Sequence, residues 1–328
     1  MSERYLLTGA AGFIASRVAQ LLLDAGHEVV GVDNLNDAYD PRLKMWRLAD
    51  LKRHAAFRFE QLDVAHAREV NDFFVASANA RPFSAVLHLA ARAGVRQSVD
   101  TPQIYVETNV TGSLNLLEAC RSAGIPKFVL ASSSSLYGDT TEAPFREDMD
   151  TSRPVSPYAA SKKGAEAMTY AYHRLHGIDV TVARYFTAYG PAGRPDMSVF
   201  RFVRHLVEGE PVSVYGDGTQ RRDFTYVDDL ARGTVLALRP VGYEIVNLGS
   251  DHPVPLRQVL ESIAQHTGKT PDIRFLPAHA ADVPATWADI SKARRLLGWQ
   301  PEVSLDEGLG RSVAWYLENR AFAASLAL

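Results

Sequence analysis

Short apolar runs alternate with amphipathic stretches through the first half of the chain, and this alternation limits the folds that it can adopt. Because strands that alternate with helices form a parallel, doubly wound sheet, the sequence predicts an α/β fold. Right-handed crossovers then place a ligand at the carboxyl ends of the strands. A helix is predicted over residues 12–25, and strands over residues 5–8, 28–32, 57–62, 85–89, 127–131 and 179–183.

The pattern changes beyond about residue 185. Proline and glycine gather in Gly190-Pro191-Ala192-Gly193-Arg194-Pro195, which predicts a loop, and shorter elements follow it. A chain of 328 residues is long enough for one large domain and a smaller one. We expect a first domain over residues 1–184 and a smaller C-terminal substrate-binding lobe over residues 185–328. Segments near residues 225–250 are expected to return to the first domain.

Composition argues against several classes of partner and location. The net charge of -3 gives no polybasic attraction to nucleic acid or to an anionic membrane surface. No apolar run approaches the ~20 residues of a membrane span, and the first residues show no signal-peptide pattern. The single cysteine, Cys120, lies in an apolar helical run, which predicts a buried and inert thiol in a reducing compartment. We expect a soluble, cytoplasmic protein without nucleic-acid or membrane partners.

A glycine-containing turn directly follows the first predicted strand, in the segment Thr8-Gly9-Ala10-Ala11-Gly12-Phe13-Ile14-Ala15. Its two glycines permit a tight turn and close backbone approach to a phosphate, and the next helix offers free N–H groups at its start. Ala15 replaces the usual third glycine and is small enough to preserve the packing of helix on strand. The position between a strand and a helix predicts a Rossmann-type dinucleotide site. A simple strand–helix turn is the alternative.

A carboxylate closes the second predicted strand. Asp33, 24 residues after Gly9, can accept hydrogen bonds from a ribose diol and would repel a 2′-phosphate. Residues 34–36 contain no arginine, so the pattern favours NAD over NADP. Asp63, after the third strand, is either an adenine contact or a capping residue. The predicted cofactor contacts also include Phe13, Ile14, Asn34, Val64, Leu89, Ala90, Ala91 and Ser132.

Tyr158 and Lys162 are four residues apart, so in a helix they share one face. An ammonium group beside a tyrosine favours the phenolate. At roughly 4 Å and an effective dielectric constant near 20, this attraction is about 4 kcal/mol before desolvation losses. It would bring the tyrosine pKa from about 10 toward neutral pH, which makes Tyr158 a candidate general base. An ordinary surface Tyr–Lys pair is the alternative.

These motifs together resemble the extended short-chain dehydrogenase/reductase family over nearly the whole chain, and within it the nucleotide-sugar epimerases. The family motifs are the glycine turn, Ser133, Tyr158-Ala159-Ala160-Ser161-Lys162 and Tyr185. The likeness is closest to UDP-glucuronate 4-epimerases. It is carried by Asp33-Asn34-Leu35-Asn36-Asp37-Ala38-Tyr39-Asp40, Ala93-Gly94-Val95-Arg96, Gly193-Arg194-Pro195-Asp196-Met197 and Arg222-Asp223-Phe224-Thr225-Tyr226-Val227-Asp228-Asp229.

The resemblance implies a role for each matching position. Tyr158 matches the catalytic base, Lys162 the lysine that lowers its pKa, and Ser133 the residue that hydrogen-bonds the reacting hydroxyl. Tyr185 and Asn109 match residues at the cofactor cleft. For the UDP-sugar substrate the matching or candidate residues are Arg96, Ser134, Thr187, Arg194, Tyr215, Arg222 and Asp282, with Arg222 on the diphosphate and Tyr215 near the uracil.

The resemblance implies NAD-dependent 4-epimerisation of a UDP-sugar through a 4-keto intermediate. With UDP-glucuronate this intermediate is a β-keto acid that loses CO₂ readily, so its carboxylate must be held. Candidates for holding it are Ser134, Thr187, Arg194 and Arg96. Arg194 either neutralises the carboxylate or is simply solvated, and Arg222 either binds phosphate or is a surface arginine.

The same residues bear on several alternative functions. Related 4,6-dehydratases carry an Asp-Glu pair where this chain has Ser134 and Ser135, and UDP-glucuronate decarboxylases usually carry glutamate at position 135, so epimerisation is favoured. A UDP-glucose or UDP-N-acetylglucosamine 4-epimerase remains an alternative. A non-catalytic NAD-sensing scaffold is another, although such proteins usually lose the Tyr–Lys pair.

The remaining expectations concern metals, histidines and assembly. No Cys/His cluster has metal-ligand spacing, so no metal is predicted. His88 lies inside an apolar strand and is expected to be a satisfied core residue. His279 lies where relatives often carry a phosphate-binding arginine, which puts part of the phosphate grip in doubt. By resemblance, helices near residues 102–120 and 157–176 form a homodimer interface.

Overall fold

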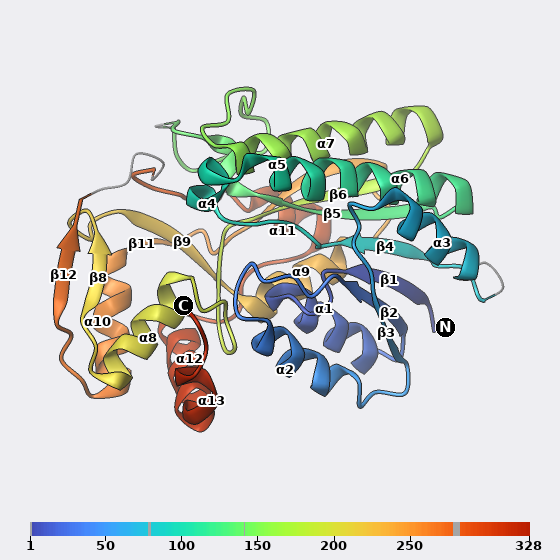
Figure 1. The fold of residues 1–328 in the computed structure, drawn as a ribbon. Helices are drawn as coiled ribbons and strands as arrows, with labels where there is room; N and C mark the ends of the chain where they lie inside the picture. The colour runs from blue at the N-terminus through green and yellow to red at the C-terminus, as the bar shows by residue number, and fades with distance from the viewer. Residues whose placement is uncertain (1, 78–79, 141, 278–282) are drawn as a thin grey trace.

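The computed structural model describes residues 2–77, 80–140, 142–277 and 283–328. At its centre is a seven-stranded parallel sheet in the order β10–β6–β5–β4–β1–β2–β3, which confirms the predicted α/β class (Figure 1). The strands of this sheet are β1 (Arg4–Thr8), β2 (Glu28–Asp33), β3 (Phe57–Gln61), β4 (Ala85–His88), β5 (Lys127–Ser133), β6 (Asp179–Tyr185) and β10 (Tyr243–Leu248).

Helices cover both faces of this sheet, so its central strands are buried along their whole length and carry nearly continuous apolar runs. Figure 1 shows α6 and α7 on one face and α1 and α9 on the other. The helices of this domain are α1 (Phe13–Asp24), α2 (Pro41–Leu51), α3 (Ala67–Ser77), α4 (Val95–Asp100), α5 (Pro102–Tyr105), α6 (Gly112–Ala123), α7 (Pro157–His176), α9 (Val227–Leu236) and α11 (Ser291–Leu297), with a π-helical segment (Val106–Thr111) and a 3₁₀ turn (Ser134–Tyr137).

The strand order changes direction at β1, and this opens a crevice. β1 pairs with β2 on one side and with β4 on the other, so the loops that follow these strands leave in opposite directions. In an open parallel sheet such a switch point is where ligands bind, at the carboxyl ends of the strands. The turn after β1 and the loop after β4 form its two walls.

Local signals fix the start and end of α7. The Ser156 side chain accepts a hydrogen bond from the Ala159 amide at 3.2 Å, and Pro157 occupies the first helical position. Gly177 ends the helix in a left-handed conformation with φ of 70°. These caps place Tyr158 in the first turn of α7, near the carboxyl edge of β5.

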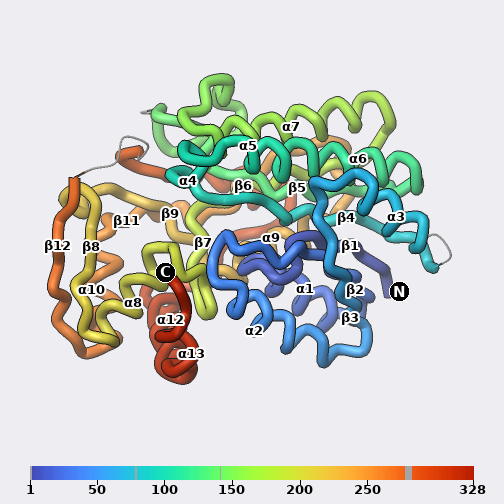
Figure 2. The backbone as a smooth tube through the Cα atoms, in the orientation of Figure 1, coloured from blue at the N-terminus to red at the C-terminus, as the bar shows by residue number. Residues whose placement is uncertain are grey.

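A smaller lobe lies beyond the carboxyl edge of the sheet (Figure 2). Its core includes Phe200, Phe202, Leu260 and Tyr316, and Phe13 of α1 packs against it. The strands β7, β9 and β11 form one of its sheets, and β8 and β12 the other. The elements are β7 (Thr187–Tyr189), α8 (Ser198–Glu208), β8 (Val212–Tyr215), β9 (Arg221–Tyr226), β11 (Pro253–Pro255), α10 (Leu256–Thr267), β12 (Ile273–Leu276), α12 (Leu305–Glu318) and α13 (Arg320–Ala324).

Two later segments of the chain lie in the large domain. β10 pairs in parallel with β6 at the edge of the seven-stranded sheet, and α9 packs against α1. The chain therefore passes between the two parts more than once. This ties the lobe to the sheet on both sides of the crevice.

Two sequence expectations about buried residues are confirmed. Cys120 is buried in α6, and burial raises the pKa of its thiol. His88 is buried in β4 and makes hydrogen bonds with the hydroxyls of Thr8 and Ser113, at 2.8 and 3.1 Å. Burial lowers the pKa of His88 to about 3, so its imidazole is neutral. No helix in the described ranges is long and apolar enough to cross a membrane.

Candidate active site

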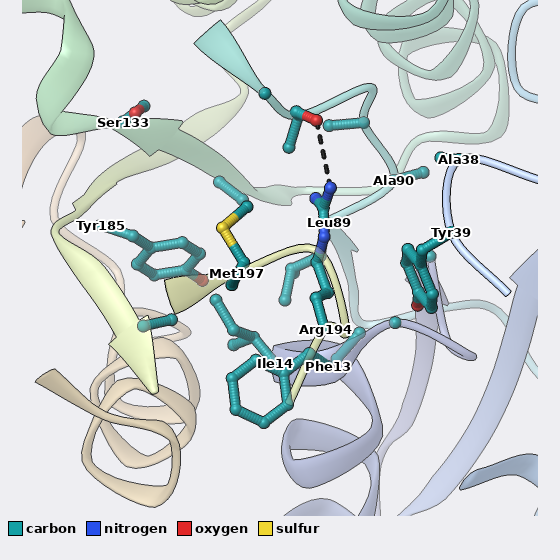
Figure 3. Close-up of a pocket in the computed structure, with 18 of the residues that line it drawn as sticks. Phe13, Ile14, Ala38, Tyr39, Leu89, Ala90, Ser133, Tyr185, Arg194 and Met197 are labelled. Carbon is teal, nitrogen blue, oxygen red and sulfur yellow. Dashed lines mark hydrogen bonds between the residues drawn. The ribbon is translucent and has the colours of Figure 1, made fainter. Parts of the chain in front are cut away.

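A cavity of about 460 Å³ opens at the carboxyl ends of β1, β2, β4, β5 and β6 (Figure 3). It contains most of the site residues predicted from the sequence, from both halves of the chain. The predicted residues that line it are Gly9, Gly12, Phe13, Ile14, Asp33, Asn34, Asp63, Val64, Leu89, Ala90, Ala91, Ser132, Ser133, Ser134, Tyr158, Lys162, Tyr185, Thr187 and Arg194.

The turn after β1 leaves no space for a side chain. Gly9 has φ of +71°, and a Cβ there would lie 2.8 Å from the backbone nitrogen of Ala90. The Gly12 amide donates to the Gly9 carbonyl at 2.7 Å and closes the turn. Gly12 is also the N-cap of α1 and brings no capping side chain, so backbone N–H groups at the helix start face a ligand.

Asp33 is held in place at the end of β2. Its carboxylate accepts hydrogen bonds from the amides of Ala11 and Leu35, at 3.2 and 2.8 Å. Lys44 of α2 lies with its Nζ atom 3.6 Å from Asp33 Oδ1 and also lines the cavity. Burial lowers the pKa of Lys44, and the charge of Asp33 opposes this. Sequence analysis missed Lys44, because a lysine on an amphipathic helix is normally exposed.

Asp63 serves a local role and also reaches the cavity. Its carboxylate accepts hydrogen bonds from the Ala65 amide at 2.9 Å and from the Asn34 side chain at 2.8 Å. Its position is compatible with both roles considered from the sequence, an adenine contact and a capping residue. Asp63 forms the local turn and still lies in the cavity wall.

Ser133, Tyr158 and Lys162 come together from β5 and α7. The hydroxyl of Ser133 donates to Ser135 Oγ and accepts the Ser135 amide, both at 3.2 Å, and Ser133 acts to lower the pKa of Tyr158. The ammonium of Lys162 donates to the Ala131 carbonyl at 2.8 Å, so it is anchored to the end of β5. A hydroxyl pair beside a buried ammonium group can transfer a proton to or from a bound alcohol.

The pKa of Tyr158 moves in the direction opposite to our prediction. Burial raises this pKa above its ordinary value, and the opposing influences are the hydrogen bond from Ser133 and the charge of Arg194. The sequence argument considered the Lys162 charge but gave too little weight to desolvation, which disfavours the phenolate. Burial also lowers the pKa of Lys162 to about 8, with Glu166 opposing.

Arg194 projects from the loop after β7 into the cavity (Figure 3). It forms a two-point ion pair with Asp196, at 3.0 and 2.7 Å, and donates to the Ala93 carbonyl at 3.3 Å. Its guanidinium carbon lies 5.3 Å from the ring centre of Tyr39. Arg194 is thus an ordered cation rather than a solvated one, and its charge reaches Tyr158.

Tyr185 forms part of the cavity wall at the end of β6. Its hydroxyl hydrogen-bonds Thr234 of α9 at 2.7 Å, and burial raises its pKa. The hydroxyl is therefore fixed to α9, while Figure 3 shows the ring beside the cavity. Thr187 lies two residues further along the chain and also lines the cavity.

Asn109 lies behind the cavity wall, in the π-helical segment. Its side-chain oxygen accepts the Arg92 amide at 2.9 Å, and its side-chain nitrogen donates to Arg92 O and Ser161 Oγ at 3.0 and 2.9 Å. The side chain thus ties the loop after β4 to α7, and a direct cofactor contact stays a prediction. The same segment brings Thr108, which sequence analysis missed, into the lining. π-Helical turns often mark functional sites, but the sequence carries no signal for one here.

Tyr215 and Arg222, predicted for the UDP moiety, and Arg96, a candidate for holding the sugar carboxylate, lie outside this lining. The guanidinium of Arg96 lies 4.0 Å from the ring centre of Tyr215. Arg222 donates to two backbone carbonyl oxygens, at 2.8 and 3.5 Å. Asp282 and His279 fall outside the described residues. Binding of UDP by these residues stays a prediction.

Comparison with known proteins agrees with this geometry. The sequence model of the NAD-dependent epimerase/dehydratase family matches residues 5–249. The chain belongs to this family. UDP-glucuronate 4-epimerase of Thermodesulfobacterium geofontis is 53% identical over 316 residues, which are 96% of each chain.

Solved structures of similar proteins share the fold. UDP-glucuronic acid 4-epimerase from Bacillus cereus, in complex with UDP-glucuronic acid and NAD, has a TM-score of 0.89 and 36% identity, over 96% of this chain and 99% of that one. UDP-glucose 4-epimerase from Thermotoga maritima with UDP-glucose has a TM-score of 0.88 and 31% identity, over 97% of this chain and 99% of that one.

The site fits the NAD of this epimerase/dehydratase family. The glycine turn provides a cradle that a Cβ at Gly9 would fill, and Asp33 places a carboxylate where a ribose would lie. Gly9, Gly12, Asp33 and Lys44 are the residues that would hold the adenosine half. Among the described residues no group of His, Cys, Asp and Glu could hold a metal ion.

The glycine turn generates a test with a matched control. Ala at position 9 would collide with the Ala90 backbone, whereas Ala at position 26, which has a similar φ of +80°, would meet nothing within 4 Å. We expect Gly9→Ala to weaken NAD binding about tenfold or more, and Gly26→Ala to leave it unchanged. NAD released from the purified, denatured proteins measures this. Equal NAD contents in the two variants would contradict the assignment.

Proposed function

We propose that this protein is an NAD-dependent isomerase that interconverts UDP-glucuronate and UDP-galacturonate by epimerisation at C4. The observation that carries the proposal is the acid–base content of the cavity. Tyr158 and Ser133 both line it, while Asp33 and Asp63 are the only carboxylates in its described lining. Asp33 ends β2 and Asp63 follows β3, on the other side of β1 from β5. One proton-transferring centre suits oxidation and reduction at one carbon.

The chain's own residues supply the proton transfer. Bound NAD would supply the hydride acceptor and donor for sugar C4, so that no net oxidation would occur. Ser133 orients the 4-hydroxyl, and Tyr158 accepts its proton as the 4-keto sugar forms. After the sugar has turned over, C4 is reduced from its opposite face and Tyr158 returns the proton to the 4-oxygen. Lys162 steadies the Tyr158 phenolate through its charge.

A uronic acid substrate is supported by the cation beside the catalytic pair. Arg194 is ordered, lines the cavity and acts electrostatically on Tyr158, so it lies where a carboxylate on C5 would sit. Its Nε and Nη2 atoms bind Asp196, so it would meet a substrate carboxylate through Nη1 and through the charge of the guanidinium. Ser134 and Thr187, in the same wall, offer hydroxyl donors. A carboxylate held by several donors is kept from the alignment in which the β-keto acid loses CO₂.

The proposal divides the work between two parts of the chain. Residues 1–184, joined by β10 and α9, bind NAD and carry out proton transfer, and residues 185–328 bind the UDP-sugar. The support is that the glycine turn, Ser133, Tyr158 and Lys162 all belong to the first part, whereas Thr187 and Arg194 reach the cavity from the second. We place the enzyme in the cytoplasm, in keeping with its single buried cysteine.

A panel of UDP-sugars tests the reaction and the substrate together. We expect purified protein, incubated with UDP-glucuronate and without added NAD, to form UDP-galacturonate, because the cofactor is retained and regenerated. UDP-glucose and UDP-N-acetylglucosamine should react more slowly, since they offer no carboxylate to Arg194. Turnover of UDP-glucose alone would overturn the substrate assignment. No turnover of any UDP-sugar would overturn the epimerase proposal.

Tyr158→Phe tests the proton-transfer step. Without the hydroxyl we expect kcat to fall about 10²- to 10⁴-fold, while the NAD content stays that of the parent protein. The control is Tyr170→Phe on the same helix, since Tyr170 is 51% exposed and lies outside the cavity lining. Substantial activity in Tyr158→Phe would mean that another group is the base.

The proposal also includes a homodimer formed through the π-helical segment, α6 and α7. Apolar side chains on these elements are exposed in the single chain, among them Val106 and Leu175. Covering them would recover hydrophobic free energy. Light scattering should give a mass of two 36.1 kDa chains, and Val106→Glu should shift the population toward one. A monomer at all working concentrations would refute the dimer.

A further inference from the structure

A buried carboxylate lies directly behind the catalytic residues. Glu166 follows Lys162 by one turn of α7, so Tyr158, Lys162 and Glu166 lie along one face of that helix. The Glu166 side chain is 3% exposed and pairs with Arg184 of β6, which is 1% exposed. Arg184 Nε and Nη2 donate to the two carboxylate oxygens at 2.9 and 2.8 Å.

The same carboxylate holds the strand that carries Ser133. Ser132 donates its hydroxyl proton to Glu166 Oε1 at 2.6 Å. Ser132 and Arg184 are direct partners across β5 and β6, and Ser133 and Tyr185 form the next pair. Glu166 therefore fixes both strands one residue before Ser133 and Tyr185.

The ion pair continues into a wider buried network. Arg184 Nη1 donates to the Tyr137 hydroxyl at 3.1 Å, and that hydroxyl donates to Asn247 of β10 at 2.7 Å. The carboxylate thus connects α7 with β5, β6 and, through Arg184, β10. Removing one member of a buried, satisfied network leaves its partner without compensation, so the geometry is strongly determined.

We propose that Glu166 is a positioning residue for the epimerase reaction, which holds Ser132 and, through it, Ser133, and maintains the ammonium of Lys162 by its negative charge. The inference rests on the proposed function, because it assigns Lys162 the task of stabilising the Tyr158 phenolate. Glu166 touches neither substrate nor cofactor. It acts through Ser132 and Lys162.

The charged groups around Lys162 determine in which direction the loss of Glu166 would shift the pKa of Lys162. His88 of β4 faces it as a neutral imidazole, Tyr158 lies on its own helix, and Tyr185 lies at the end of β6. Arg194 acts from the lobe through Tyr158. Of the described groups that act on Lys162, Glu166 supplies the negative charge. Burial lowers the pKa of Lys162 to about 8, and the charge of Glu166 opposes this lowering.

The sign of the pH dependence follows from this arrangement. Lys162 is charged below its pKa and loses its proton as the pH rises through about 8. Loss of this proton removes the positive charge beside Tyr158, so activity should fall on the alkaline side of the pH profile. Without the negative charge of Glu166 the ammonium is less favoured, and the fall should begin at lower pH.

Glu166→Gln tests the proposal on the NAD-loaded enzyme. We expect the alkaline limb of the kcat profile to move down by about one pH unit, because an opposite charge nearby typically shifts a pKa by that amount or more. The pH dependence of Lys162 acetylation by acetic anhydride, followed by mass spectrometry, should move in the same direction. This second measurement reports on Lys162 even if the protein turns over no UDP-sugar, so failure of the proposed function is distinguished from failure of the inference.

The control is a buried ion pair at the other end of the same two strands. Lys127 of β5 pairs with Asp179 of β6, and the pair is far along both strands from Ser133 and Tyr185. Asp179→Asn should lower the unfolding midpoint and leave both pH profiles unchanged. A purely structural role for Glu166 predicts the same result for Glu166→Gln, and that outcome would overturn the proposal.

A double variant covers the case in which Glu166→Gln does not fold. Glu166→Gln with Arg184→Met removes both charges, so that no buried charge is left without its partner. We expect this protein to fold, to bind NAD and to show a downward shift of both profiles that is smaller than in Glu166→Gln, because loss of the Arg184 charge favours the Lys162 ammonium. Profiles that superimpose on those of the parent would also overturn the proposal.

Discussion

The close approach of Gly9 to the backbone of Ala90 is the constraint on which the cavity depends. The turn after β1 and the loop after β4 meet at the point where the strand order changes direction, and a Cβ at Gly9 would lie 2.8 Å from the Ala90 nitrogen. Because the turn contributes only backbone, the N–H groups at the start of α1 are left to face a phosphate. The neutral His88 also supports this junction, because it hydrogen-bonds the Thr8 hydroxyl, which accepts a hydrogen bond from the Ala90 amide.

Buried charges then fix the side chains that the cavity uses. Asp33 is held by two amides and Lys44, Arg194 by Asp196, and Lys162 by the Ala131 carbonyl with Glu166 one turn further on. Each charge would be costly in isolation and is satisfied by a partner at short distance. The consequence is order rather than large net stability, because desolvation offsets most of the attraction between such pairs. A reaction that oxidises and reduces the same carbon benefits from side chains that are fixed in position.

The sequence predicted the sheet well and the buried polar residues less well, and both results have one cause. Strands such as β1 and β2 have apolar interiors and were located to within a residue, but β5 and β6 extend two residues further than predicted, to Ser133 and Tyr185. Polar residues at a strand end resemble a loop in sequence, and only the Glu166 carboxylate and the Arg184 guanidinium make them part of the buried sheet. Lys44 and the direction of the Tyr158 pKa shift could not be predicted for the same reason. Both depend on desolvation and on partners far away in the sequence, which only the tertiary structure defines. The parallel pairing of β8 with β12, about 60 residues apart, likewise carries no local signal.

The distribution of charge along the cavity gives a physical reason for one orientation of its contents. Asp33 ends β2 and Asp63 follows β3, where a ribose diol could use them as acceptors, and Lys44 offsets the charge of Asp33. Lys162 and Arg194 lie in the wall near Tyr158. A sugar carboxylate would therefore be attracted more strongly at the second end than at the first. The serines of β5 add donors without adding an acid that could expel water or a second group. In the proposed mechanism proton transfer is confined to Tyr158, so the sugar must turn within the site, and a single hydroxyl then serves both faces of the ring.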